Sequence, residues 1–149
     1  MKTIFDPSTC QELLHRLDSV QAGSERQWGK MSAPQMLEHT ARALEMATGR
    51  RQTNQALVGK LIGWIFRKDF VGDKPFGKNA PTGPDFIVRD EPDLEPTRER
   101  VKALIREMQA SGEKACDGRI HGFFGRMTGA EWGVTQYKHV DHHLRQFGA

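Results

Sequence analysis

The chain has 149 residues, of which 37% are hydrophobic and 28% charged. That length is enough to bury a core without disulfides, and that composition is typical of a globular protein rather than a disordered or membrane-spanning one. We therefore expect one domain over residues 1–149. The 22 Lys and Arg residues and 19 acidic residues are interleaved along the chain, so the net charge of +3 does not indicate a nucleic-acid-binding protein.

Three further features concern the compartment. Cys10 and Cys116 lie far apart and form no CxxC motif, which favours a reducing environment. The first residues contain no apolar stretch of signal-peptide length, and the segment LVGKLIGWIF at 57–66 is too short and too interrupted to span a bilayer. The sequence therefore predicts a cytoplasmic protein with neither membrane nor nucleic-acid partners.

Two helices are predicted in the first third of the chain. Asp6 and Pro7 provide a cap and a first-turn proline for the segment STCQELLHRLDSV at 8–20, whose leucines have the spacing of an amphipathic helix. Ser32 and Pro34 begin the second helix, APQMLEHTARALEMAT at 33–48, and Gly49 ends it.

The remaining elements follow a less regular segment. Residues 54–68 are apolar enough for a short helix, although two glycines weaken it, and residues 71–96 have the Gly, Pro, Asp and Lys content of a long loop. A third main helix is predicted over 95–112, and Thr128 with Glu131 forms a capping box for a fourth, which ends near Phe147. Four main helices without a convincing strand pattern predict an all-α four-helix bundle, with a short extra helix and a long loop between the second and third.

Three of the six histidines fall within the last helix, in the segment KHVDHHLRQF. An α-helix advances about 100° per residue, so His139 and His143 share one face with Trp132, Gln136 and other apolar-side positions, at about 40° from each other. His142 falls on the opposite arc with Lys138, Asp141 and Arg145, and that arc is expected to face solvent.

His139 and His143 are four residues apart, so their rings can converge on one ion, and His39 lies on the core edge of the second helix. A buried neutral histidine held by hydrogen bonds is the alternative for any one of them. Three imidazoles in one small core leave several polar atoms to satisfy, which a divalent metal would do together. Gln136 is a candidate to orient a ligand ring or the bound nucleophile, or else a buried side chain bonded to backbone.

Outside this group, His15 and His142 are predicted at the surface, and His121 is expected to cap a loop rather than line a pocket. Phe123, Phe124 and Trp64 are candidates for an apolar pocket wall. No residue suggests itself as a general base.

The segments WGKMSAPQMLEHTARAL at 28–44 and HGFFGRMTGAEWGVTQYKHVDHHLRQFG at 121–148 resemble the DUF1569 branch of the DinB-like superfamily. The resemblance covers most of the chain. It implies an up-down-down-up four-helix bundle in which one histidine of the second helix and an HxxxH pair of the last helix bind a divalent metal. In this sequence the matching positions are His39, His139 and His143.

Relatives within that superfamily include metal-dependent enzymes that attach low-molecular-weight thiols to electrophiles, so the resemblance implies a thiol transferase with a small-molecule substrate. Three neutral imidazoles leave an ion its positive charge and an open position, which favours catalysis over a structural role. Zn²⁺ or Ni²⁺ is the expected ion, and Fe or Mn the alternatives. A metal-dependent hydrolase and a non-catalytic metal-binding or dimerisation bundle remain open, and the apolar surface of the first helix and of 57–66 predicts a homodimer.

Overall fold

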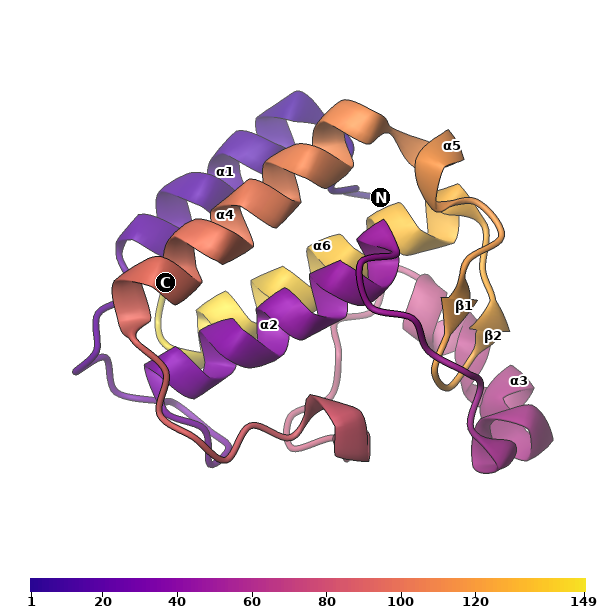
Figure 1. Ribbon diagram of the computed structural model, residues 1–149, viewed down its shortest axis with the longest axis horizontal. Coiled ribbons are helices and arrows are strands. Elements are labelled where there is room, and N and C mark those ends of the chain that lie inside the picture. The colour runs from indigo at the N-terminus through magenta and orange to yellow at the C-terminus, as the bar shows by residue number, and fades with distance from the viewer.

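The computed structural model describes residues 1–149, and most of them are helical (Figure 1). Six α-helices, one short 3₁₀ helix and two short strands follow one another along the chain: α1 (Pro7–Asp18), α2 (Ala33–Thr48), α3 (Leu57–Val71), η1 (Pro84–Phe86), α4 (Leu94–Ser111), α5 (Glu113–Cys116), β1 (Ile120–His121), β2 (Gly125–Arg126) and α6 (Gly129–Gln146). None of these helices combines the length and the apolar character that crossing a lipid bilayer requires.

Local capping explains where the long helices begin. The carboxylate of Asp6 accepts from the backbone N–H groups of Ser8 and Thr9 at the start of α1. Ser32 forms a capping box with Gln35 at α2, and Thr128 forms the predicted one with Glu131 at α6. Each box satisfies backbone donors that the first turn of a helix leaves without partners. These start positions are confirmed because they depend only on neighbouring residues.

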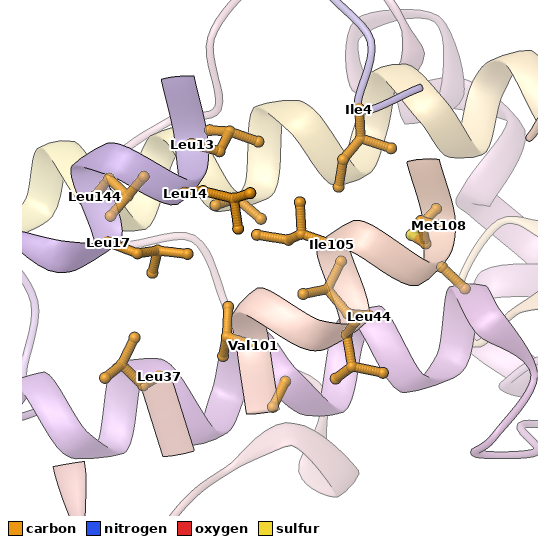
Figure 2. Close-up of a cluster of buried hydrophobic side chains, with 14 of the residues drawn as sticks. Ile4, Leu13, Leu14, Leu17, Leu37, Leu44, Val101, Ile105, Met108 and Leu144 are labelled. Carbon is orange, nitrogen blue, oxygen red and sulfur yellow. The ribbon is translucent and has the colours of Figure 1, made fainter. Parts of the chain in front are cut away.

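The hydrophobic core lies between α1, α2, α4 and α6. Helix α2 contacts α4 and α6, and α1 contacts the same two helices. In Figure 1, α4 runs alongside α1, and α2 runs alongside α6. Figure 2 shows apolar side chains of these helices pointing toward one another, among them Leu17, Leu37, Val101, Ile105 and Leu144. Since 23 buried residues form one hydrophobic cluster, the four helices are held together by apolar packing.

The structure departs from the predicted elements at α3 and at the hairpin, and it adds two short helices that were not predicted, η1 and α5. The helix predicted over 54–68 lies three residues later in the chain, because α3 begins at Leu57 and continues to Val71. The loop predicted before α6 contains a small antiparallel hairpin, in which Ile120 pairs with Arg126 and His121 with Gly125. Strands of two residues are too short to show the alternation of apolar and polar positions by which a strand is recognised.

The outer arc of α6 is more covered than predicted. Lys138 and Asp141 are buried, and only Arg145 of that arc is exposed. The Lys138 ammonium donates to the carbonyl oxygens of Asp69, Phe70 and Gly72, at 3.1, 2.8 and 2.7 Å. Asp141 forms an ion pair with Arg16 of α1 at 2.8 Å. The end of α3 and the side of α1 therefore cover a helix face that the helical spacing alone assigns to solvent.

Candidate metal centre

Helices α2 and α6 bring His39, His139 and His143 together. One nitrogen from each ring lies within 4.8 Å of the other two, and the group contains no carboxylate or thiol. His39 and His143 are buried, whereas His139 is partly exposed. A tetrahedral ion with Zn–N bonds of 2.0–2.1 Å places its ligand nitrogens about 3.3 Å apart, so small side-chain movements would accommodate one.

Two of the rings have their second nitrogen held by an amide or peptide oxygen. Nδ1 of His39 lies 3.0 Å from the carbonyl oxygen of Phe86, which belongs to η1. Nδ1 of His143 lies 2.9 Å from Oε1 of Gln146. A carbonyl oxygen only accepts, so Nδ1 carries the proton in both rings and Nε2 keeps its lone pair. This arrangement is the one that metal-binding histidines usually adopt.

Gln146 is itself fixed by the loop before α2. Its Nε2 donates to the carbonyl oxygen of Trp28 at 2.7 Å, which orients Oε1 toward His143. Gly29, at φ +81°, lies against this amide, and a Cβ there would clash with Nε2 of Gln146. The loop thus provides a slot for the Gln146 side chain that requires glycine at position 29. The helical spacing of the histidines does not reveal this role of Gln146, although Gln146 lies three residues after His143.

The third ring differs from the other two. Nε2 of His139 lies 3.0 Å from Nε2 of His39, while its Nδ1 is buried without a hydrogen-bond partner. Oε1 of Gln136, one turn earlier on α6, is also buried without a partner. A protonated Nδ1 and an amide oxygen are complementary, and a neutral His139 ring has its proton on Nδ1 when Nε2 is unprotonated, as it is when Nε2 binds an ion. The two unpartnered atoms therefore fit an ion at the His139 Nε2 atom.

All three rings are neutral at physiological pH. Burial lowers the pKa of His143 to about 3, with the neighbouring His39 adding to the effect. Burial likewise lowers the pKa of His39, and it lowers that of His139 far below its usual value. Since only the unprotonated nitrogen binds a metal, the same burial that opposes charge on these rings keeps them ready to act as ligands.

The other three histidines are not part of this group. His15 is exposed, as predicted. His121 caps its loop, because its Nδ1 accepts from the backbone N–H groups of Phe123 and Phe124 at 3.0 and 3.2 Å. His142 was expected at the surface but is only partly exposed, since its ring lies 5.4 Å from that of Trp28 and 6.3 Å from that of Phe76.

Aromatic residues from α3 and its following loop lie beside two histidines outside the group, Phe70 beside His121 and Phe76 beside His142. The Phe70 ring stacks on Phe76 at 4.8 Å and contacts Phe124 at 4.2 Å. Lys78 places its ammonium 4.4 Å from the Trp28 ring. Of the predicted pocket wall, Phe124 packs against the core, whereas Trp64 is 75% exposed on the outside of α3. The prediction that Trp64 belongs to an apolar pocket wall is therefore wrong.

The fold and the site thus define a mostly helical protein with a three-histidine cluster on its second and last main helices. The chain belongs to the DUF1569 family, whose description is "Protein of unknown function", and the match covers residues 5–149. Neither the search of curated proteins nor that of solved structures found a match.

Proposed function

We propose that this protein is a divalent-metal-dependent transferase of the DinB-like superfamily, which joins a low-molecular-weight thiol to a small electrophile. We also propose that the chain has the up-down-down-up four-helix bundle of that superfamily. The observation that carries it is the three-histidine group, in which the rings are neutral and two of them have Nε2 freed by a hydrogen bond at Nδ1.

His39, His139 and His143 would hold the ion through Nε2, and imidazole ligands favour Zn or Ni, with Fe or Mn as alternatives. A divalent ion with three neutral ligands keeps its charge and an open position, so it lowers the pKa of a thiol that binds there. Phe86 and Gln146 orient two of the ligand rings. The Phe86 ring, 6.3 Å from the His39 ring, would limit the access of water to that side of the cluster.

The reacting thiol comes from a co-substrate. The chain's own thiols, Cys10 and Cys116, are free and buried, and burial raises the pKa of both. They are poor nucleophiles for that reason, and two free cysteines accord with the reducing environment of the cytoplasm. In the proposed reaction the thiol releases its proton to solvent and its sulfur bonds to the electrophilic carbon. The leaving group departs with the electron pair of the broken bond, so no oxidant or reductant is needed.

The test uses untagged protein loaded with Zn²⁺ or Ni²⁺, a panel of small thiols, and aryl halide and epoxide electrophiles. We expect holo protein to form thioethers faster than the uncatalysed rate. Metal-free protein and His139→Ala should show no acceleration over that rate. Hydrolysis of ester substrates without any thiol would instead indicate a hydrolase. Holo protein that is inert toward every thiol and ester would favour a non-catalytic metal-binding bundle.

Gln136 has a proposed role at the third ligand. Rotation of its side chain would let Oε1 accept from Nδ1 of His139 once Nε2 binds the ion, because the two residues lie one turn apart. The competing donor is Nε1 of Trp132, which is also buried without a partner one turn before Gln136. We expect Gln136→Leu to weaken metal binding roughly 10–100-fold. The matched variant Trp132→Phe should leave metal affinity unchanged, and equal effects of both would contradict the assignment.

A further inference from the structure

Helix α3 has its large apolar side chains on the outside. Its only buried residues are Gly59 and Gly63, whereas Leu57, Leu61 and Trp64 are 77%, 74% and 75% exposed. Val58 and Ile65 are exposed by 53% and 52%. Figure 1 shows α3 at the edge of the molecule, beside the β1–β2 hairpin. A surface helix normally has the opposite arrangement, with its apolar stripe toward the core.

Five of the seven exposed apolar residues of α3 form one continuous face, and Ile62 and Phe66 lie outside it. At about 100° per residue, Trp64, Leu57, Leu61, Ile65 and Val58 fall within an arc of about 120°. The two glycines lie on roughly the opposite side of the helix. We call these five residues the α3 face. Lys68, at the end of the helix, is the only charged residue within its arc.

Contacts on the inner side fix this orientation. The peptide of Phe123 approaches α3 so closely that a Cβ at Gly63 would lie 2.9 Å from its carbonyl oxygen, and one at Gly59 would clash with it. Arg67 pairs with Glu131 at 2.7 Å and donates to the carbonyl oxygen of Phe124 at 3.1 Å. Lys138 binds three carbonyl oxygens at the far end. Turning the apolar residues inward would break all of these contacts, so the exposure of the α3 face is specified by the fold.

We propose that the α3 face is the interface of a homodimer, in which two α3 helices pack antiparallel across a twofold axis. A whole large side chain has a surface of roughly 150–250 Å². The exposed fractions of the five residues of the α3 face therefore leave on the order of 600 Å² uncovered per copy. Two copies would bury about 1,200 Å², the lower limit for specific stable interfaces. The antiparallel arrangement places Leu61 and Trp64 near the axis and keeps the two Lys68 ammonium groups at opposite ends.

A membrane surface fits this helix less well. Helices that lie on membranes combine the apolar face with a polar face rich in Lys and Arg. The side of α3 opposite the α3 face is occupied by the glycine contacts, and Arg67 is paired with Glu131. Lys60 and Lys68 remain, with Asp69 beside them. That charge is too small and too balanced for strong attraction to anionic lipids.

Sedimentation velocity and light scattering at increasing micromolar concentration test the proposal. We expect a species of twice 16.9 kDa for the wild type and a monomer for Leu61→Lys and Trp64→Lys. Ile87→Lys is the matched control, because Ile87 is an exposed apolar residue outside α3. This variant protein should remain dimeric. Circular dichroism should show unchanged helix content in all three variants, since each changes an exposed side chain.

A second measurement uses the fluorescence of the wild type, with Trp64→Phe as its control. Trp64 is exposed in the single chain, so its emission should shift to shorter wavelength as the dimer forms, and Trp64→Phe should remove that shift. A wild type that stays monomeric at all concentrations overturns the proposal, as does a Leu61→Lys variant that remains dimeric. Monomeric wild type that sediments with phosphatidylglycerol vesicles would assign the α3 face to a membrane instead. None of these results depends on metal or activity.

Discussion

The Nε2 atoms of His39 and His139 lie 3.0 Å apart, although 100 residues separate the two histidines in the sequence. Two imidazole nitrogens at this distance need a proton or a cation between them, because their lone pairs would otherwise repel. The proton of His39 is on Nδ1, opposite the carbonyl oxygen of Phe86. The contact is therefore either a hydrogen bond donated by His139 or the place where an ion binds between the two rings.

Replacing any one of His39, His139 and His143 with Ala should weaken Zn²⁺ or Ni²⁺ binding by more than the roughly 10–100-fold typical of an outer partner. His142→Ala is the matched control, since it removes an imidazole next to His143 that offers no nitrogen to the group. Competition with a metal chromophore measures the affinities. Loss of binding in His142→Ala together with its retention in His143→Ala would show that the ligand set is wrong.

Gln146→Leu should lower metal affinity roughly 10–100-fold while leaving the helices intact, because His143 loses the acceptor that fixes its tautomer. Gly29→Ala should act in the same direction by displacing the Gln146 amide. Gln27→Ala serves as the control, since only the backbone of Gln27 bonds to position 146. Nitrogen chemical shifts of the His143 ring would report the tautomer directly. Unchanged shifts in Gln146→Leu would contradict the assigned role.

Metal-free protein should lose stability as the pH falls below 6.5. Burial lowers the folded-state pKa of His121 to about 4, with the nearby Arg67 charge adding to it. The unfolded chain, with a pKa near 6.5, then binds more protons than the folded one, so this stability is complete above that pH and disappears toward pH 4. From neutral pH to pH 5 the loss attributable to His121 is about 2 kcal/mol.

Urea unfolding of His121→Asn isolates this contribution. Its side-chain oxygen can still accept from the N–H groups of Phe123 and Phe124, but it does not titrate. The variant should therefore lose less stability than the wild type over the same pH interval, whatever its stability at neutral pH. Parallel curves for the two proteins would exclude His121 as a source of the pH dependence.

Removing the metal should abolish the proposed activity and leave the fold. Twenty-three buried hydrophobic residues pack together in one cluster, so the core is held by apolar packing and does not need an ion. At free metal a hundredfold above its dissociation constant, binding adds about 2.7 kcal/mol to the free energy of unfolding and raises the melting temperature. Circular dichroism with and without chelator checks the helix content. Unfolding of the metal-free protein would mark the ion as structural.

The parts of this structure that the sequence predicts are those decided by near neighbours. Asp6, Ser32 and Thr128 identify the starts of three helices because each cap involves residues two or three positions away. Helical spacing likewise places His139 and His143 on one face. Bringing His39 to them from α2 follows from both helices directing their apolar sides to the same core.

Contacts from distant loops explain what the sequence does not reveal. Helical spacing alone assigns Lys138 to solvent, because spacing contains no information about the distant carbonyl oxygens of Asp69, Phe70 and Gly72 that Lys138 contacts. His142 is partly covered for a related reason, since Trp28 approaches it from the loop before α2. The role of Gln146 likewise depends on where that loop passes.

The hydrogen bonds of Arg16 bear on how the cluster tolerates thermal motion. Its guanidinium binds the carboxylate of Asp141 at 2.8 Å and the carbonyl oxygen of Ala149 at 3.0 Å, so α1 holds both sides of the last turn of α6. Helix ends usually fray, and fraying here would carry Gln146 away from His143. Helix α1 contributes no nitrogen to the cluster, yet the Arg16 contacts should slow the opening motion that would release one. Amide hydrogen exchange in the last turn of α6 should therefore be unusually slow for the end of a helix, and Arg16→Ala should accelerate it.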